Sequence, residues 1–173
     1  FLDHTPSHFQ ALALQNTNVH LYYMIAQISD ELYLQLNACG KIIENHVDED
    51  ISVYGDSDKL ARVFNNILKN AISYSTDNSV IKVSAKELSE WTVIQFENDG
   101  EIPEEKLNVI FDKFCRLSNA RLSETGGSGL GLAIAKNIIV LHGGQIKAES
   151  SNGRTAFIIE IPLDSSKIPV TKP

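Results

Sequence analysis

The spacing of apolar residues changes along the chain, and this change limits the fold more than any other feature. Between residues 19 and 36, and again between residues 60 and 71, apolar side chains recur every three or four positions, as on one face of an amphipathic helix. Other segments alternate in polarity or are short and apolar, which is typical of strands: 42–43, 51–53, 80–85, 92–96, 145–150 and 155–161. Helices and strands in such blocks indicate an α+β protein.

Residues typical of turns and caps divide these segments. Asp56-Ser57-Asp58 supplies N-cap candidates for a helix that fades near Ser75, and Gly40 suits the C-terminal end of the first helix. Asn152-Gly153 predicts a tight hairpin between the last two strands. With a third helix over 130–141, we expect a two-layer sandwich of three helices on a largely antiparallel sheet.

Composition excludes several classes of protein. The 173 residues predict one domain, 43% of them are hydrophobic, and the net charge is −7. An acidic chain has no general attraction for polyanions, so nucleic acid is not an expected partner. Cys39 and Cys115 are the only cysteines and form no CxxC pair, which argues against a structural zinc site and fits a reduced compartment.

A glycine-rich segment provides the first sign of function. Gly126-Gly127-Ser128-Gly129-Leu130-Gly131-Leu132 runs directly into the third helix. Glycines let the backbone approach a ligand closely, and the N-terminal end of a helix adds N–H donors that suit phosphate oxygens. No Gly-Lys-Ser/Thr follows, so this is not a P-loop, and a flexible hinge before the helix would give the same composition.

Two asparagines in the second helix are the next sign. Asn66 and Asn70 lie four positions apart, hence on one face, although asparagine is a poor residue for a helix interior. A carboxamide oxygen is a hard, neutral ligand that suits Mg²⁺ already bound to phosphate. Because Asn65 lies beside them, a solvated polar face remains the alternative.

Strand alternation assigns a third polar residue to the interior. Ile94, Phe96 and Asn98 share one side of a strand, so Asn98 should follow two apolar residues into the core. An asparagine amide can pair with the amino group and a ring nitrogen of adenine. The alternative is a side chain that caps the Asp99-Gly100 turn.

These segments, in this order, resemble the ATP-binding domain of bacterial sensor histidine kinases. Four ordered motifs of that family, its N, G1, F and G2 boxes, are similar to Asp58–Tyr74, Asn98–Pro103, Ile110–Phe114 and Gly127–Leu132, and His142-Gly143-Gly144 resembles the turn that closes the domain. The lid sequence is also similar to that of VanS-type sensors. The resemblance covers about residues 18–162.

The resemblance implies a Bergerat fold, a mixed, mostly antiparallel sheet covered by three helices, with ATP and Mg²⁺ beneath a mobile lid. It implies that Asn70 holds Mg²⁺ with help from Asn66, that Tyr74 lies near the nucleotide, and that Asn98 meets adenine. It assigns further nucleotide contacts to Gly100, Ile102, Gly127, Ser128, Gly129, Leu130, Gly131 and Leu132.

This chain departs from the family pattern in ways that bear on the site. Asn98 stands where the family usually has aspartate, and the following segment is one residue shorter. Ser73 replaces a basic residue that is common three positions after the Mg²⁺ ligand. Phosphate neutralisation would then fall on Mg²⁺ and on lid cations, for which Lys113, Arg116 and Arg121 are candidates, unless these are only solvated charges.

The resemblance also implies an organisation for the chain. We expect residues 1–17 to be a linker or the end of a dimerisation hairpin, 18–162 the ATP-binding domain, and 163–173 a tail. Residues 99–127 should form the lid, which we expect to be mobile because few apolar residues anchor it. None of the five histidines has the sequence context of a phosphoacceptor.

The expected function is therefore the catalytic domain of a two-component histidine kinase, cytoplasmic in a membrane-anchored bacterial sensor. Its partners would be the parent's own phosphoacceptor hairpin and a response regulator; we expect a dimeric parent and a monomeric fragment. Alternatives are a serine kinase or ATPase of the same fold, or an interaction module that no longer binds ATP. Hydrolysis is disfavoured because Asn66 stands where related ATPases place the glutamate that activates water.

Overall fold

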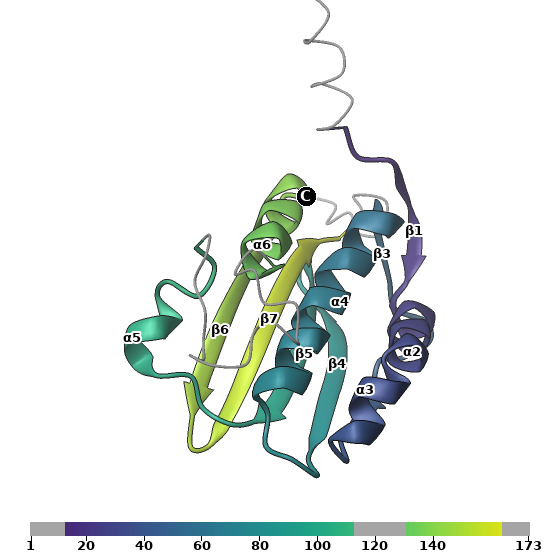
Figure 1. Ribbon diagram of the computed structural model, residues 1–173. Helices are drawn as coiled ribbons and strands as arrows, with labels where there is room; N and C mark the ends of the chain where they lie inside the picture. Colours follow the sequence, from purple (N-terminus) through teal and green to yellow (C-terminus); the bar gives the residue numbers. More distant parts are fainter. Residues whose placement is uncertain (1–12, 113–130, 164–173) are drawn as a thin grey trace, which may run out of the picture.

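A five-stranded sheet forms one layer of the molecule. The computed structural model describes residues 13–112 and 131–163. The strand order is β2 (Ile42–Asn45), β4 (Val80–Leu88), β5 (Trp91–Asp99), β7 (Arg154–Pro162) and β6 (Gln145–Ser151) (Figure 1). Only the pairing of β2 with β4 is parallel among these strands. The sheet is therefore mixed and mostly antiparallel, as predicted.

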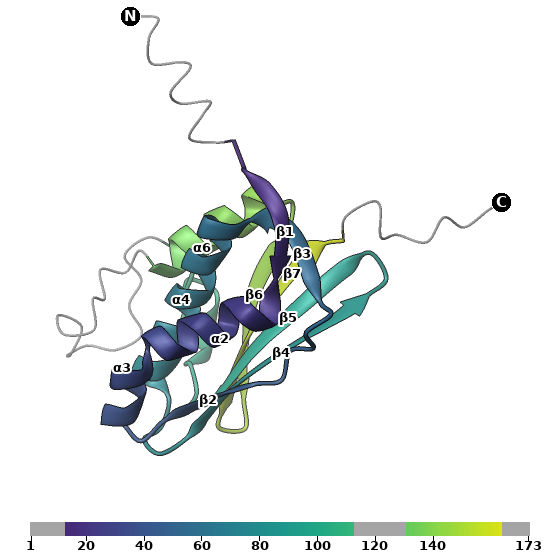
Figure 2. The ribbon, with the colours of Figure 1, turned by 90° about the vertical axis from the view of Figure 1, so that its right-hand side faces the viewer.

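Helices form the second layer, on one face of the sheet (Figures 1 and 2). They are α2 (Leu21–Glu31), α3 (Tyr33–Ala38), α4 (Ser57–Tyr74) and α6 (Gly131–Leu141), and a short α5 (Glu104–Leu107) lies beside β6. The apolar stripe of α4 and the inward residues of β5 and β7 are fully or almost fully buried and make a single core. No helix in the described ranges is long and apolar enough to cross a bilayer.

The N-terminal region differs from the expected pattern. Residues Asn16–His20 form a strand, β1, which pairs with β3 (Ser52–Asp56) in a separate antiparallel ribbon. The sequence did not predict β1, because Val19 is its only buried residue and no alternation is visible. The single helix expected over 19–36 is also interrupted: Leu32 separates α2 from α3, although it remains buried in the common stripe.

The first residues of α4 are held by the predicted cap. The side chain of Asp56 accepts a hydrogen bond from the backbone N–H of Lys59 at 3.1 Å and another from that of Gln15 at 3.0 Å. Burial alone would raise the pKa of Asp56, but these two donors and the Lys59 ammonium group together hold the pKa below its ordinary value. Asp56 thus joins the β1 strand to the start of α4.

A buried lysine forms hydrogen bonds at the C-terminal end of α4. Lys41 is 4% exposed, and its ammonium group donates to the backbone oxygens of Ile72 and Ser75. These carbonyls belong to the last turn of the helix, where backbone acceptors lack partners within the helix. Lys41 therefore fixes the end of α4 that carries Tyr74.

Candidate functional site

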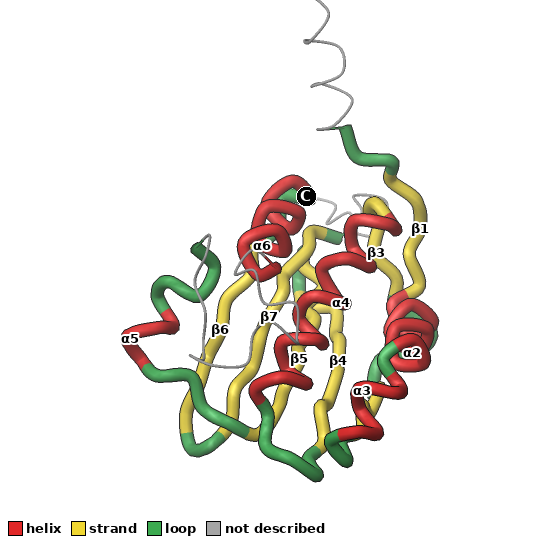
Figure 3. Tube along the Cα trace, in the orientation of Figure 1, coloured by secondary structure: helices red, strands yellow, loops and turns green. Residues whose placement is uncertain are grey.

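Five of the residues singled out from the sequence surround one small cavity. Asn70 and Tyr74 belong to the last turns of α4, Asn98 to the end of β5, and Gly100 and Ile102 to the loop that follows β5. The C-terminal end of α4 and this loop lie at the same end of the sheet (Figure 3). The remaining wall residues are Glu101, Thr155 and Phe157. We call this the α4–β5 cavity. Its volume is about 20 Å³, close to that of one water, so a larger ligand would need the walls to move apart.

Asn98 occupies the interior position that strand alternation predicted. It is 5% exposed, on the same side of β5 as Ile94 and Phe96, which are buried. Its amide nitrogen donates to the backbone oxygen of Asp99 at 2.9 Å. This bond uses one of the two amide N–H groups, and the amide oxygen is the group that Asn98 can offer to a hydrogen-bond donor of a ligand.

Gly100 is required by its surroundings. Its φ angle is +119°, a region that side chains rarely allow, and a Cβ atom would lie 3.0 Å from the backbone oxygen of Tyr74. The loop therefore passes against the C-terminal end of α4. This close approach brings Gly100 and Ile102 to the wall shared with Asn70 and Tyr74.

The two asparagines of α4 occupy different surroundings. Asn70 lines the α4–β5 cavity. Asn66, one turn earlier, donates its amide N–H to the backbone oxygen of Gly131 at 3.1 Å and so ties α4 to the first residue of α6. The structure thus gives Asn66 a positioning contact; its assistance to Mg²⁺ stays a prediction.

Part of the predicted site lies outside the described residues. This applies to the glycine-segment residues Gly127, Ser128, Gly129 and Leu130 and to the lid cations Lys113, Arg116 and Arg121. Gly131 and Leu132 begin α6, where Leu132 is buried in the core. The described start of the lid packs on the sheet: Ile110 is 2% exposed, and the Phe111 ring lies edge-on to Phe157 with centroids 6.2 Å apart.

The sequence interpretation missed the wall residues contributed by β7. Thr155 and Phe157 face the same side as Ile159 and Ile161, and all four are at most 3% exposed. The alternation that located Asn98 would have located Thr155, since the two are register partners on adjacent strands. Glu101 carried no comparable signal, because it lies in a loop.

The α4–β5 cavity offers one side-chain oxygen of the kind that Mg²⁺ binds. Asn70 can provide a neutral amide oxygen, and Mg²⁺ in nucleotide sites takes few protein ligands while phosphates and waters complete its shell. Within residues 13–112 and 131–163, no three His, Cys, Asp or Glu residues gather as a metal site of their own. The residues present therefore fit a metal that arrives with phosphate.

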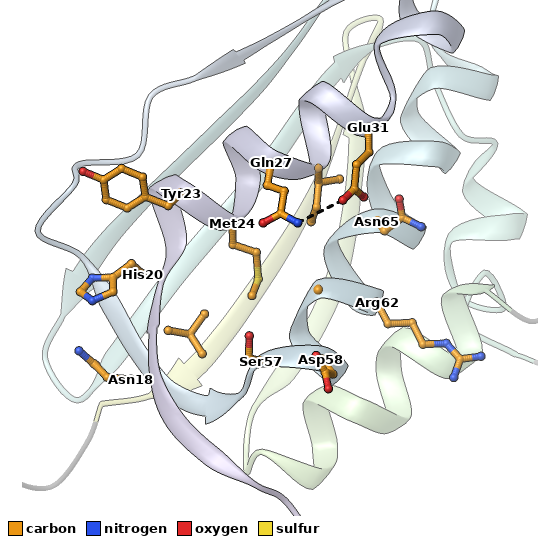
Figure 4. A pocket seen from close by; sticks show the side chains of 13 residues that line it. Asn18, His20, Tyr23, Met24, Gln27, Glu31, Ser57, Asp58, Arg62 and Asn65 are labelled. Atoms are coloured by element: carbon orange, nitrogen blue, oxygen red, sulfur yellow. Dashed lines mark hydrogen bonds between the residues drawn. The ribbon is translucent and has the colours of Figure 1, made fainter.

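A second, larger hollow lies between α2 and α4 (Figure 4), and we call it the α2–α4 groove. Its volume is about 700 Å³, and its walls come from β1, α2 and the first half of α4. Figure 4 shows the hydrogen bond from the Gln27 amide to Glu31, at 3.2 Å. Tyr23 on its rim donates to Glu49, and this hydrogen bond and the Glu49 charge raise the pKa of Tyr23.

The sequence matches a known protein family over most of the described domain. Residues 55–165 match the family described as histidine kinase-, DNA gyrase B-, and HSP90-like ATPases. The chain is 55% identical to the sensor protein VanS of Enterococcus faecium over 162 residues, which are 94% of this chain and 42% of that protein. The chain thus spans less than half of that relative.

Solved structures have the same fold. The nucleotide-free catalytic domain of histidine kinase ThkA superposes with a TM-score of 0.75 at 28% identity, covering 86% of this chain and 95% of that one. ThkA in complex with the response regulator TrrA gives a TM-score of 0.74 at 24% identity, covering 95% of this chain and 50% of that one. The expected two-layer fold is confirmed by these similarities.

Proposed function

Because this chain belongs to the family of histidine kinase-, DNA gyrase B- and HSP90-like ATPases, we propose that it is the Mg-ATP-binding catalytic domain of a two-component sensor histidine kinase. It delivers the γ-phosphoryl group of ATP to a histidine on a helical domain of the parent protein. The observation that carries the proposal is the α4–β5 cavity, where Asn70, Tyr74, Asn98, Gly100 and Ile102 meet.

The cavity residues divide the work of holding the nucleotide. The Asn98 amide oxygen accepts from the adenine amino group, while one N–H of the same amide donates to the backbone oxygen of Asp99. Gly100 lets the loop lie close to the base, and Ile102 and Tyr74 enclose it. Asn70 provides an oxygen ligand for Mg²⁺, which neutralises phosphate charge when bound. The N-terminal end of α6 faces the phosphates.

Transfer is favoured over hydrolysis by the chemistry of Asn66. Its amide cannot accept a proton from water, and one of its N–H groups donates to the backbone oxygen of Gly131. The nucleophile is therefore a ring nitrogen of the partner domain's histidine. This nitrogen bonds to the γ-phosphorus as the bond to the β–γ bridging oxygen breaks, and ADP leaves. The chain contributes positioning and electrostatics.

Relatives supply the wider setting of the proposal. The parent carries its own phosphoacceptor hairpin, forms a homodimer through it, and passes phosphate to a response regulator, as histidine kinases do. The domain described here lies on the cytoplasmic side of a membrane-anchored sensor. The glycine segment and the lid cations Lys113, Arg116 and Arg121 lie outside the described residues, and their part in phosphate binding stays a prediction.

The test is transfer in trans. The fragment is mixed with the isolated histidine-bearing hairpin of the parent and with ATP labelled at the γ-phosphate, with and without Mg²⁺. We expect acid-labile label on the hairpin only when Mg²⁺ is present, and none on the fragment alone. Absence of Mg-ATP binding, or steady release of phosphate with no labelled protein, would overturn the proposal.

A further inference from the structure

A chain of hydrogen bonds links the loop after β5 to the β6–β7 hairpin. We propose that Ser150, which does not line the α4–β5 cavity, is a positioning residue for adenine recognition: its hydroxyl fixes the Gly100–Ile102 loop that forms one wall of the cavity. This inference rests on the proposed function, because it concerns how the same cavity distinguishes nucleobases.

The polar backbone groups of the loop are bound by the hairpin. The N–H of Ile102 donates to the Ser150 hydroxyl oxygen at 2.8 Å, and the N–H of Gly100 donates to the backbone oxygen of Gly153 at 2.7 Å. The carbonyl of Gly100 accepts from the Thr155 hydroxyl at 2.7 Å. Both ends of this three-residue loop therefore depend on β6 and β7 for their place.

The Ser150 hydroxyl is itself held by β7. Thr155 donates its proton to the Gly100 carbonyl, so in its 3.1 Å contact with Ser150 it can only accept. The single Ser150 proton has two acceptors within reach, the Thr155 hydroxyl oxygen at 3.1 Å and the backbone oxygen of Arg154 at 3.2 Å. With either acceptor, the Ser150 oxygen that accepts from the Ile102 N–H is fixed to β7.

Strand register places these hydrogen bonds beside Asn98, the residue proposed to contact adenine. Asn98 pairs with Thr155, and Thr155 pairs with Ser150, so the three polar side chains form one row across β5, β7 and β6. The row lies at the end of an apolar face that includes Phe96 and Phe157. A displaced loop would alter the part of the cavity wall that Gly100, Glu101 and Ile102 form.

The β6–β7 hairpin, which holds the Gly100–Ile102 loop, has a tight turn. Asn152 and Gly153 have φ angles of 53° and 76°, the left-handed pair expected of a two-residue hairpin turn. The N–H of Gly153 also donates to the Glu101 carboxylate at 2.9 Å. The middle residue of the loop is therefore attached to the same turn.

The test compares nucleobases. Affinities for ADP and for purine riboside diphosphate, which has a hydrogen in place of the adenine amino group, are measured for four proteins: wild type, Ser150→Ala, Ser150→Thr and Ser151→Ala. Removing the partner of a buried N–H should weaken ADP binding by about five- to tenfold. The affinity for purine riboside diphosphate should change by less than about twofold, because this base has no amino group from which the Asn98 oxygen could accept.

The variants separate positioning from general loss of stability. Ser151 is exposed at the adjacent position, so Ser151→Ala should bind as wild type does, and Ser150→Thr, which keeps the hydroxyl, should restore ADP binding. Equal losses for both nucleotides, or a Ser150→Ala protein that binds ADP as well as Ser151→Ala, would overturn the positioning role alone. A wild-type protein that binds neither nucleotide would overturn the proposed function and this inference with it.

Discussion

The α4–β5 cavity and the α2–α4 groove contrast in size and in the state of their polar groups. The groove is the larger by far, about 700 Å³ against about 20 Å³. Its polar side chains are largely exposed, and the bond between Gln27 and Glu31 joins neighbours on one helix. The cavity gathers residues from α4, β5, β7 and a loop, and its buried Asn98 and Thr155 both form hydrogen bonds.

The state of the polar groups, rather than the volume of the hollow, favours the cavity as the proposed site. Burying a polar side chain is unfavourable unless it is hydrogen-bonded, so a fold retains such a group where other contacts hold it. Asn98 could be replaced by an apolar residue if only packing mattered at the end of β5. The polar residues of the groove are exposed, so no cost of burying polar groups arises there. Exposed polar residues on α2 and α4 are typical of any helix surface.

The largest expected effect comes from Asn70. Asn70→Ala removes the proposed Mg²⁺ ligand, and phosphoryl transfer to the supplied hairpin should fall by at least about 100-fold, because metal neutralisation of phosphate contributes several kcal/mol. Initial rates of labelling at saturating ATP measure this effect. The exposed neighbour offers a control: Lys69→Ala should transfer at the wild-type rate. Undiminished transfer in Asn70→Ala would show that the α4–β5 cavity does not bind Mg²⁺ through Asn70.

Asn98 should have the next largest effect. Asn98→Ala removes the proposed acceptor for adenine and leaves a small gap, so ADP affinity should fall about tenfold. Asp99, whose carboxylate forms a half-exposed ion pair with Arg154 at 3.3 Å, provides the comparison. Asp99→Ala should change affinity by less than about twofold, since exposed ion pairs contribute little. The opposite ranking would show that strand alternation selected the wrong residue.

These residues also show which parts of the site could be predicted. Alternation along β5 placed Asn98 in the interior, and the four-residue spacing from Asn66 singled out Asn70, because both patterns are local properties of sequence. Tyr74 came only from the family resemblance. Thr155 was equally open to the argument from alternation. Ser150 and Lys41 were not, since their contacts join residues 48 and 31 positions apart and depend on how the layers pack. The β1 strand gave no signal because one side of it faces solvent with no apolar residue.

Asp56 should affect stability rather than ligand binding. It is buried near the α2–α4 groove but is not one of the residues that line the groove. Asp56→Ala removes the cap of α4 and should lower the free energy of unfolding at pH 7 by about 1–2 kcal/mol. Because the pKa of Asp56 is depressed by folding, its contribution is present above the unfolded value of about 3.9 and is lost as pH falls through the folded value.

Urea unfolding at neutral and acidic pH measures this contribution. The difference in stability between wild type and Asp56→Ala should shrink as the pH falls through that range. The exposed Asp58 is the control, and Asp58→Ala should cost less than about 1 kcal/mol. A difference that grows on acidification would contradict the sign of the shift.

The smallest effect is expected in the groove itself. Gln27→Ala breaks only the bond to Glu31, and Met24→Ala enlarges a hollow that is already open. Both variants should bind Mg-ADP within about twofold of wild type, because neither side chain contributes to the α4–β5 cavity. Calorimetric titration measures the affinities. A tenfold loss in either variant would make the groove, not the cavity, the better candidate.

The most direct test observes the side-chain amides of both regions in a single NMR titration. Mg-ADP is added to the isotopically labelled fragment, and the amide signals of Asn70 and Asn98 are followed together with those of Asn18, Gln27 and Asn65 in the groove. The account predicts that the first two shift with a common dissociation constant while the other three stay in place. Shifts confined to the groove, with Asn70 and Asn98 unchanged, would contradict it.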